Sequence, residues 1–205
     1  MVYRFVRTLL RILYSILFPL DVRGKEHIPK EGPVLLCANH ISLLDPPAIG
    51  IWLERRISFF AKAELFKIPL LASILRQLGA IPVRRGARDR KALTATLEVL
   101  KQGGMVGIFP EGTRVKSGML EEAKKGVAFF ALRSDAVVVP TAIIGPYRLF
   151  RKTKIVYGPP VDLSSYRNGK PNSAVMEEVS GLIMQHIRRL AQESIEQTIN
   201  LHTIE

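Results

Sequence analysis

The segment Leu35-Leu36-Cys37-Ala38-Asn39-His40-Ile41-Ser42-Leu43-Leu44-Asp45-Pro46-Pro47 sets the architecture of this chain. It follows Gly32-Pro33, and the apolar run from Val34 to Cys37 is typical of a buried inner strand. Asp45 then stands where a helix N-cap is expected, with Pro46 at the first helical position, where a missing N–H does no harm. The segment therefore predicts a strand, a tight turn and a helix.

His40 and Asp45 lie at the two ends of that turn, which can bring their side chains together. A carboxylate near a helix N-terminus stays ionised because the helix dipole favours the anion. Held against an imidazole, it fixes the tautomer and makes the other ring nitrogen more basic. The pair therefore predicts a general base with its orienting carboxylate. Taken alone, Asp45 is more simply a helix cap and His40 a structural histidine.

Strands and helices alternate through the rest of the chain. We expect strands at 34–39, 57–61, 80–83, 105–109, 136–144 and 154–157, with a short edge strand within 22–29. We expect helices at 2–20, 46–55, 68–78, 89–102, 125–134 and 173–198. Asp89 caps the fourth of these helices and Gly103-Gly104 ends it. This alternation is typical of an α/β domain with a mixed, largely parallel central sheet flanked by helices.

Composition places the chain among basic globular proteins. Its 205 residues suit one domain, or one domain with an appendage, and 47% hydrophobic residues allow a sizeable core. The formal net charge of +12 implies an anionic partner: nucleic acid, an anionic membrane surface or a phosphorylated substrate. Cys37 is the only cysteine, which excludes an internal disulfide and indicates a reducing compartment.

Residues 1–21 form a segment ahead of a domain that we place at 22–205. Its polar residues fall at helical spacing and form one stripe, while apolar side chains cover the rest of the surface. The uncharged run from Ile12 to Leu20 is too short to span a bilayer, which needs about 20 apolar residues. We interpret the segment as an amphipathic helix in the membrane interface, with arginines at the headgroups. The predicted membrane contacts are Arg4, Arg7, Leu9, Arg11, Leu13 and Phe18.

Two other interpretations of the N-terminal segment stand beside this one. It could be an ordinary amphipathic helix packed on the domain. A signal peptide fits less well, because Arg11 interrupts the apolar region and no small-residue cleavage site follows.

Polar residues follow several of the predicted strands. Asn39-His40 follows the first, Arg84-Arg85 the third and Glu111-Gly112-Thr113-Arg114 the fourth. In open α/β sheets, ligands bind beyond the carboxyl ends of the strands, so we expect these groups to converge on one cleft. Gly112 permits a tight turn, and Arg114 can hold a phosphate with two hydrogen bonds. Taken separately, each cluster is more simply a solvated turn.

Together these segments resemble the glycerolipid O-acyltransferases of the 1-acylglycerol-3-phosphate acyltransferase type. The four sequence blocks of that family occur here in the family's order, within residues 22–165. They are Asn39 to Asp45 (Asn-His-four residues-Asp), Gly79 to Arg85 (a Gly-x-Ile-x-x-x-Arg pattern), Phe109 to Arg114 (Phe-Pro-Glu-Gly-Thr-Arg) and Val137 to Thr141 (an apolar run into a proline). Lys124-Lys125-Gly126 is similar to the segment that follows the third block. In the second block, the spacing favours Arg84 over Arg85 as the functional arginine.

The resemblance implies transfer of an acyl group from acyl carrier protein or coenzyme A to the free sn-2 hydroxyl of lysophosphatidic acid. It implies no further cofactor, no metal and no nucleic acid, and a place on the cytoplasmic face of the cell membrane, as a monotopic or peripheral protein. His40 would be the general base and Asp45 its orienting partner. Arg84 and Arg114 would bind the acceptor phosphate. The residues expected to shape the rest of the acceptor site are Asn39, Glu111, Gly112 and Thr113.

Other functions remain open at this point. The acceptor could be another lysolipid or glycerol 3-phosphate, or the chain could be a catalytically inactive lipid-binding scaffold. A basic nucleic-acid-binding protein would need exposed aromatic residues among its Lys and Arg, but aromatic residues make up only 7% of the chain. Cys37 invites a covalent acyl-enzyme. However, its place in the strand puts it on the opposite face from Ala38 and His40, so we expect a buried structural cysteine.

Overall fold

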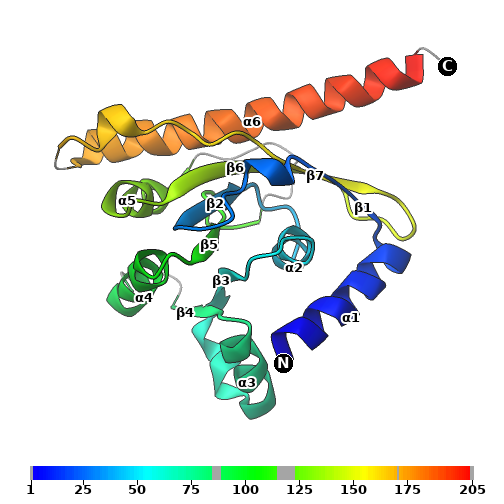
Figure 1. Cartoon of the computed structure of the whole chain (residues 1–205), viewed down its shortest axis with the longest axis horizontal. Coiled ribbons are helices and arrows are strands. Elements are labelled where there is room, and N and C mark those ends of the chain that lie inside the picture. Colours follow the sequence, from blue (N-terminus) through cyan, green and yellow to red (C-terminus); the bar gives the residue numbers. More distant parts are fainter. Residues whose placement is uncertain (1, 85–88, 115–122, 170, 204–205) are drawn as a thin grey trace.

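A seven-stranded sheet runs through the centre of the described chain, with helices on both of its faces (Figure 1). The computed structural model describes residues 2–84, 89–114, 123–169 and 171–203. In spatial order the strands are β1 (Leu20–Arg23), β7 (Thr153–Tyr157), β6 (Val137–Ile144), β2 (Val34–Ala38), β5 (Met105–Ile108), β3 (Ile57–Lys62) and β4 (Ile81–Val83). All neighbouring strands are parallel except β6 and β7. The expected mixed, largely parallel sheet is confirmed.

The helices also fall where the sequence predicts them. They are α1 (Val2–Leu17), α2 (Asp45–Gly50), α3 (Pro69–Gln77), α4 (Arg90–Lys101), α5 (Gly126–Arg133) and α6 (Ser173–Thr203). Asp89 caps α4 as expected, because its carboxylate accepts hydrogen bonds from the backbone N–H groups of Lys91 and Ala92. The largest difference is α2, which we expected to continue to residue 55 but which ends at Gly50.

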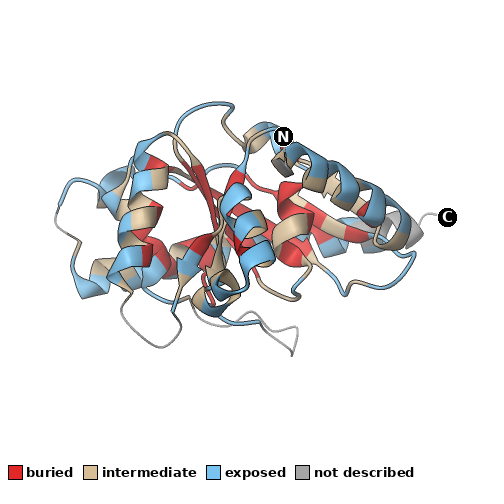
Figure 2. Cartoon of the chain, turned by 90° about the horizontal axis from the view of Figure 1, so that it is seen from below, coloured by how far each residue is buried: buried red, intermediate tan, exposed pale blue. Residues whose placement is uncertain are grey.

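One face of the sheet is sealed by α4, α5 and α6. Leu35 and Cys37 of β2 point to this side, where they pack with Val138 of β6 and with Ile183 of α6. Figure 2 shows the buried residues gathered along the sheet and on the sides of the helices that cover it. Alternation along the strand sends Leu36 and Ala38 to the opposite face.

That opposite face is covered by α1 and α2, while α3 lies beyond β4 (Figure 1). Helix α1 docks here through Tyr14, which is 1% exposed and donates a hydrogen bond of 2.8 Å to the carbonyl of Leu44. The Arg7 guanidinium donates to the carbonyl of Leu53 at 3.0 Å, and that of Arg11 to the carbonyl of Ile51. These last two carbonyls lie just after α2, where helix ends attract cations.

Two residues of the polar stripe of α1, Arg7 and Arg11, therefore face the protein, which differs from the headgroup contacts expected for them. Arg7 and Arg11 are half-buried against the end of α2, Phe18 is half-buried beside Tyr14, and Arg4 alone of the three arginines is exposed. Part of the apolar surface of the helix points outward, whereas Leu10 and Tyr14 pack on the core. The exposed apolar stripe of α1 consists of Phe5, Leu9, Ile12, Leu13 and Ile16.

Candidate active site

The carboxyl ends of β2, β5, β3 and β4 meet at one edge of the sheet, because these four strands are parallel neighbours. His40 follows β2, and Phe109 and Glu111 follow the adjacent β5. The expected convergence of polar groups on this edge is therefore realised for the first and third sequence blocks. Lys62, the last residue of β3, reaches the same region.

Asp45 holds the turn between β2 and α2 in place. Its Oδ2 atom lies 2.7 Å from Nδ1 of His40 and accepts hydrogen bonds from the backbone N–H groups of Ile41 (2.7 Å) and Ser42 (2.8 Å). The carboxylate is completely buried, and the His40 side chain is 12% exposed. With Nδ1 donating to this carboxylate, Nε2 of His40 is left as the acceptor, which is the state that a general base needs.

The N-cap prediction for Asp45 was wrong by one residue. Leu44 is the cap residue, and Asp45 is the first residue of α2. The carboxylate turns back to the N–H groups of residues 41 and 42 instead of capping those that follow it. The interaction that orients His40 has therefore displaced the ordinary helix cap.

Two residues of the third block support His40 directly. The Phe109 ring stacks on the imidazole with ring centroids 3.9 Å apart and an angle of 15° between the planes. Glu111 is 1% exposed, and its Oε2 atom accepts a hydrogen bond of 2.8 Å from the backbone N–H of His40. Phe109 thus holds the face of the imidazole ring, and Glu111 holds the backbone of the same residue.

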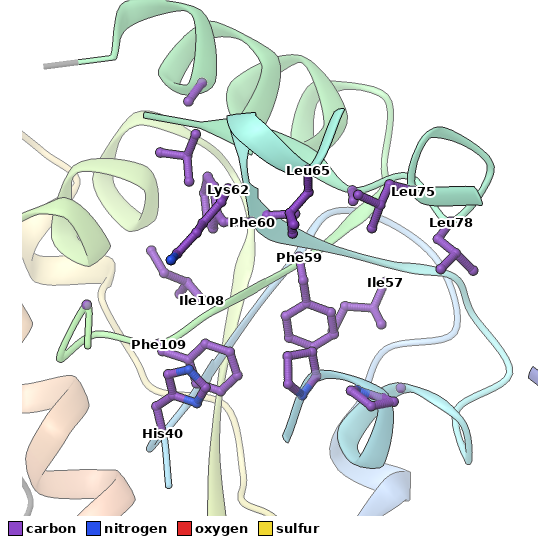
Figure 3. A pocket seen from close by; sticks show the side chains of 18 of the residues that line it. His40, Ile57, Phe59, Phe60, Lys62, Leu65, Leu75, Leu78, Ile108 and Phe109 are labelled. Atoms are coloured by element: carbon purple, nitrogen blue, oxygen red, sulfur yellow. The ribbon is translucent and has the colours of Figure 1, made fainter. Parts of the chain in front are cut away.

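A cavity of about 1030 Å³ begins at His40 and extends between the sheet and α3. Figure 3 shows His40 and Phe109 at one end and mostly apolar side chains along the rest. This volume lies at the upper end of the roughly 300–1,000 Å³ found for small-molecule sites. Its apolar lining includes Ile57, Phe59, Phe60, Leu65, Leu75, Leu78 and Ile108. The site therefore joins a histidine–aspartate pair to a long apolar chamber.

The structure places two of the expected acceptor residues in supporting roles. Asn39 is 3% exposed, and its side-chain amide makes both of its hydrogen bonds to the backbone of Ile143 in β6, at 2.7 and 3.0 Å. Glu111 holds the His40 backbone, as described above. Both side chains thus tie neighbouring strands to the histidine turn instead of lining the cavity.

The remaining predicted residues lie around the rim of the site. Gly112 lines the cavity with φ +72°, and a side chain there would collide with the stem of Lys124. Thr113, Arg114 and Arg84 are exposed, and neither arginine is among the described residues that line the cavity. The Arg84 backbone donates to Asp89, and together with the N–H of Ala92 this bond lowers the pKa of that carboxyl. Arg85 lies outside the described residues.

The structure adds cations that the sequence had not assigned to the acceptor site. Lys62, Arg90 and Lys124 line the cavity, and Figure 3 shows Lys62 reaching into it above Ile108. The signal for Lys62 was its position at the carboxyl end of a predicted strand, the same logic that singled out His40.

Cys37 is fully buried on the far face of the sheet, where burial raises the pKa of its thiol. A thiol that stays protonated is a poor nucleophile, which supports the structural role expected for it. No group of three or more His, Cys, Asp or Glu side chains able to hold a metal ion occurs within the described ranges.

This fold and site define an α/β enzyme class in which a histidine–aspartate pair opens onto an apolar chamber. The model of the Acyltransferase family matches residues 19–144, so the chain belongs to that family of enzymes. It is 28% identical over 194 residues to the 1-acyl-sn-glycerol-3-phosphate acyltransferase of Bacillus subtilis, covering 92% of this chain and 96% of that protein.

Two further relatives complete the comparison. The crystal structure of the 1-acyl-sn-glycerophosphate (LPA) acyltransferase from Thermotoga maritima matches with a TM-score of 0.71 and 29% identity, over 94% of this chain and 77% of that one. A lyso-ornithine lipid O-acyltransferase of Pseudomonas aeruginosa is 32% identical over 126 residues, which are 61% of this chain and 48% of that protein. The family resemblance drawn from the four blocks is confirmed.

Proposed function

We propose that this chain transfers a fatty acyl group from a thioester donor to the sn-2 hydroxyl of 1-acylglycerol 3-phosphate. The observation that carries this proposal is the His40–Asp45 pair at the end of an apolar cavity of about 1030 Å³. The relatives from Bacillus subtilis and Thermotoga maritima, which are named for this class of acceptor, support the choice.

In the proposed reaction, Nε2 of His40 takes the proton of the acceptor hydroxyl as its oxygen attacks the thioester carbonyl. The new ester C–O bond forms, the C–S bond breaks, and the imidazolium returns the proton to the leaving thiolate. Asp45 keeps Nδ1 protonated and stabilises the imidazolium. General base catalysis of this kind contributes roughly 10²–10⁴-fold. Because the acceptor hydroxyl attacks directly, the chain needs no nucleophile of its own.

The apolar cavity is the proposed site of the acyl chain. Its walls come from β3, β5 and α3, so a chain whose thioester lies beside His40 would extend between them. Burial of apolar surface is worth about 25 cal/mol per Å², which gives a long acyl chain a strong hold without any polar contact.

The acceptor phosphate is proposed to bind among the cations at the rim. The cavity is lined by Lys62, Arg90 and Lys124. Arg84 and Arg114 are exposed, and each lies within two residues in the sequence of a residue that lines the cavity. A phosphate held by two or more cations would place the glycerol hydroxyl close to His40. The proposed phosphate site thus contains Arg84 and Arg114, which the sequence indicates, and the three cations that line the cavity.

The exposed stripe of α1 is the proposed membrane contact. Phe5, Leu9 and Ile16 are more than half exposed, and the opposite side of the helix is fixed to the domain by Arg7, Arg11 and Tyr14. An apolar helix face that turns away from its own domain suits the headgroup–acyl boundary. None of the described helices is both long and apolar enough to cross a bilayer. The exposed stripe and the family resemblance support our proposal of a monotopic or peripheral enzyme at the cytoplasmic face.

An acyltransferase for another lysolipid is the second candidate, and the relative from Pseudomonas aeruginosa favours it. The two differ in the acceptor headgroup. An assay should therefore cross acyl-coenzyme A and acyl carrier protein with 1-acylglycerol 3-phosphate, lyso-ornithine lipid and glycerol 3-phosphate, using radiolabelled donors in mixed micelles. We expect the highest kcat/KM with 1-acylglycerol 3-phosphate. A preference for lyso-ornithine lipid would select the second candidate, and no transfer to any of the three would contradict both.

Paired variants test the phosphate site. A hydrogen bond to a charged group contributes about 1.5–3 kcal/mol, so Lys62→Ala should raise the KM for 1-acylglycerol 3-phosphate about tenfold or more. Arg84→Ala should have a similar effect. Lys101→Ala, at the far end of α4, is the matched control and should leave KM unchanged. An unchanged KM in Lys62→Ala or Arg84→Ala would remove that residue from the phosphate site.

A further inference from the structure

We infer that Tyr147 is a positioning residue for this reaction: its hydroxyl donates a hydrogen bond to Oδ1 of Asp45 and completes a chain from Tyr147 through Asp45 to His40. The inference rests on the proposed function of the His40–Asp45 pair. It assigns a role to a residue that lies outside the four sequence blocks.

Asp45 has one oxygen that the histidine turn does not use. Its Oδ2 atom serves His40 Nδ1 and two backbone N–H groups, whereas Oδ1 is buried and has no hydrogen-bond partner among the described residues. An ionised carboxylate accepts hydrogen bonds through both oxygens, and leaving one buried acceptor without a donor is costly. A donor for Oδ1 is therefore expected nearby.

Tyr147 has a hydroxyl donor that is also buried and without a hydrogen-bond partner among the described residues. The Tyr147 ring lies edge-on to Phe18, with centroids 6.3 Å apart, within the core that also contains Leu44. Burial raises the pKa of Tyr147, and the nearby negative charge of Asp45 raises that pKa further. Asp45 is thus close enough for its charge to act on Tyr147, and each residue has a buried polar atom without a hydrogen-bond partner.

The chain path explains why Tyr147 reaches this position. It follows β6, the neighbour of β2, and the Asn39 side chain pins Ile143 of β6 to the start of the histidine turn. Two residues before Tyr147, Gly145 packs so closely on Ile41 that any side chain there would collide with it. The same connection continues to Phe150, whose backbone N–H donates to the Leu17 carbonyl at the end of α1. The loop is therefore held on both sides of Tyr147.

The hydroxyl has two consequences for the proposed base. It fixes the rotation of the Asp45 carboxylate, so that Oδ2 stays directed at His40. It also stabilises the carboxylate most when His40 is neutral, because the negative charge is then uncompensated. Removing the donor should favour the state with protonated His40, so the acid limb of the rate profile should move to higher pH. The other titratable groups that surround this pair are Tyr14 of α1, Tyr157 of β7 and Glu111.

Tyr147→Phe tests the inference, because it removes only the hydroxyl. We expect kcat to fall about tenfold, the KM for 1-acylglycerol 3-phosphate to stay within about twofold, and the acid limb of kcat against pH to rise by about half a unit. Tyr157→Phe is the matched control. It removes a buried hydroxyl that donates to the Ile49 carbonyl of α2 at 2.6 Å, and it should leave the pH profile in place.

Two further measurements separate positioning from general loss of structure. In the Asp45→Asn background, Tyr147→Phe should lower kcat by a much smaller factor than in the wild type, because the two side chains act as one unit. The low-field proton resonance of the His40 Nδ1–H bond should move in Tyr147→Phe and stay in Tyr157→Phe, whatever the substrate. An unmoved resonance with an unshifted acid limb would overturn the inference. A wild-type protein without acyl transfer, but with the moved resonance, would overturn the proposed function and support the contact.

Discussion

Helices α1 and α6 are both amphipathic, yet they dock on the sheet in different ways. The apolar residues Val179, Ile183 and Met184 of α6 are at most 1% exposed and pack on the sheet. On α1, Phe5 and Leu9 are 68% and 56% exposed, and the helix docks through Arg7, Arg11 and Tyr14. A hydrophobic stripe thus predicts a helix, but the partner groups decide which face it buries.

The difference follows from what each face of the sheet offers. The α6 side presents mostly apolar strand residues, which match an apolar helix face. The α1 side presents carbonyls around and after α2, which accept hydrogen bonds from Arg7, Arg11 and Tyr14. One side of the molecule, under α6, is therefore closed and supports stability, while the other, open side contains the histidine pair and the exposed stripe. The cavity receives lining residues from both sides, since Leu93 of α4 and Phe130 of α5 also line it. Substitutions on the two sides should separate activity from stability.

His40→Ala should show the largest effect on the open side. Without the general base, kcat should fall by roughly 10²–10⁴-fold. The change leaves the sheet core intact but removes one hydrogen bond from the buried Asp45 carboxylate, so the variant should fold with a free energy of unfolding lower by about 1.5–3 kcal/mol. Radiolabelled acyl transfer and urea unfolding measure the two quantities. His27→Ala, a histidine that contacts Tyr157 outside the site, should keep full activity. Near wild-type turnover in His40→Ala would refute the mechanism.

Ile183→Ala should show the reverse on the closed side. The Ile183 side chain is fully buried in α6 against the sheet, and such truncations cost about 2–5 kcal/mol of unfolding free energy. Below its melting temperature the variant should retain the kcat/KM of the wild type. Ile195→Ala, on the same helix but 45% exposed, should change stability by no more than about 0.5 kcal/mol. If Ile183→Ala lost activity while still folded, the two sides would not be separable.

Leu9→Ser tests the exposed stripe of α1 at a smaller scale. If this residue enters the lipid interface, its loss should weaken binding to anionic vesicles by about tenfold, since a buried leucine contributes about 1.5–3 kcal/mol. Stability in solution should not change, because the side chain is 56% exposed there. Ile195→Ser on α6 is the matched control and should bind vesicles as the wild type does. Vesicle sedimentation decides the matter, and equal binding by both variants would exclude the stripe as the lipid contact.

The same comparison shows what the sequence could and could not predict. Alternating strands and helices, Asp89 as a cap and the His40–Asp45 pair are encoded within short segments, where local spacing determines geometry. The partners of Asn39 and Glu111 depend on which strands lie beside β2, and no local pattern carries that order. Asn39 contacts Ile143 across 104 positions, and Glu111 contacts His40 across 71. Their side chains were therefore expected at the substrate.

The orientation of α1 was missed for a related reason. The polar stripe of the helix could be recognised, but the carbonyls that it meets belong to the irregular segment after α2. That segment was expected to be helical up to residue 55, which would have satisfied some of those carbonyls internally. The early end of α2 at Gly50 leaves the Ile51 and Leu53 carbonyls available to arginine.

Cys37→Ala should give the smallest effect, although Cys37 lies three residues from the proposed base. Its side chain faces the closed side of the sheet, with Leu35, while His40 opens to the other side. Burial keeps the thiol protonated, so it has no part in the transfer. We expect kcat within about twofold of the wild type and a loss of about 1 kcal/mol in stability, close to the transfer free energy of one buried methylene. Burst kinetics of the wild type should show no acyl-enzyme. A trapped acyl thioester on Cys37 would contradict direct attack by the acceptor hydroxyl and would give this buried cysteine a catalytic role.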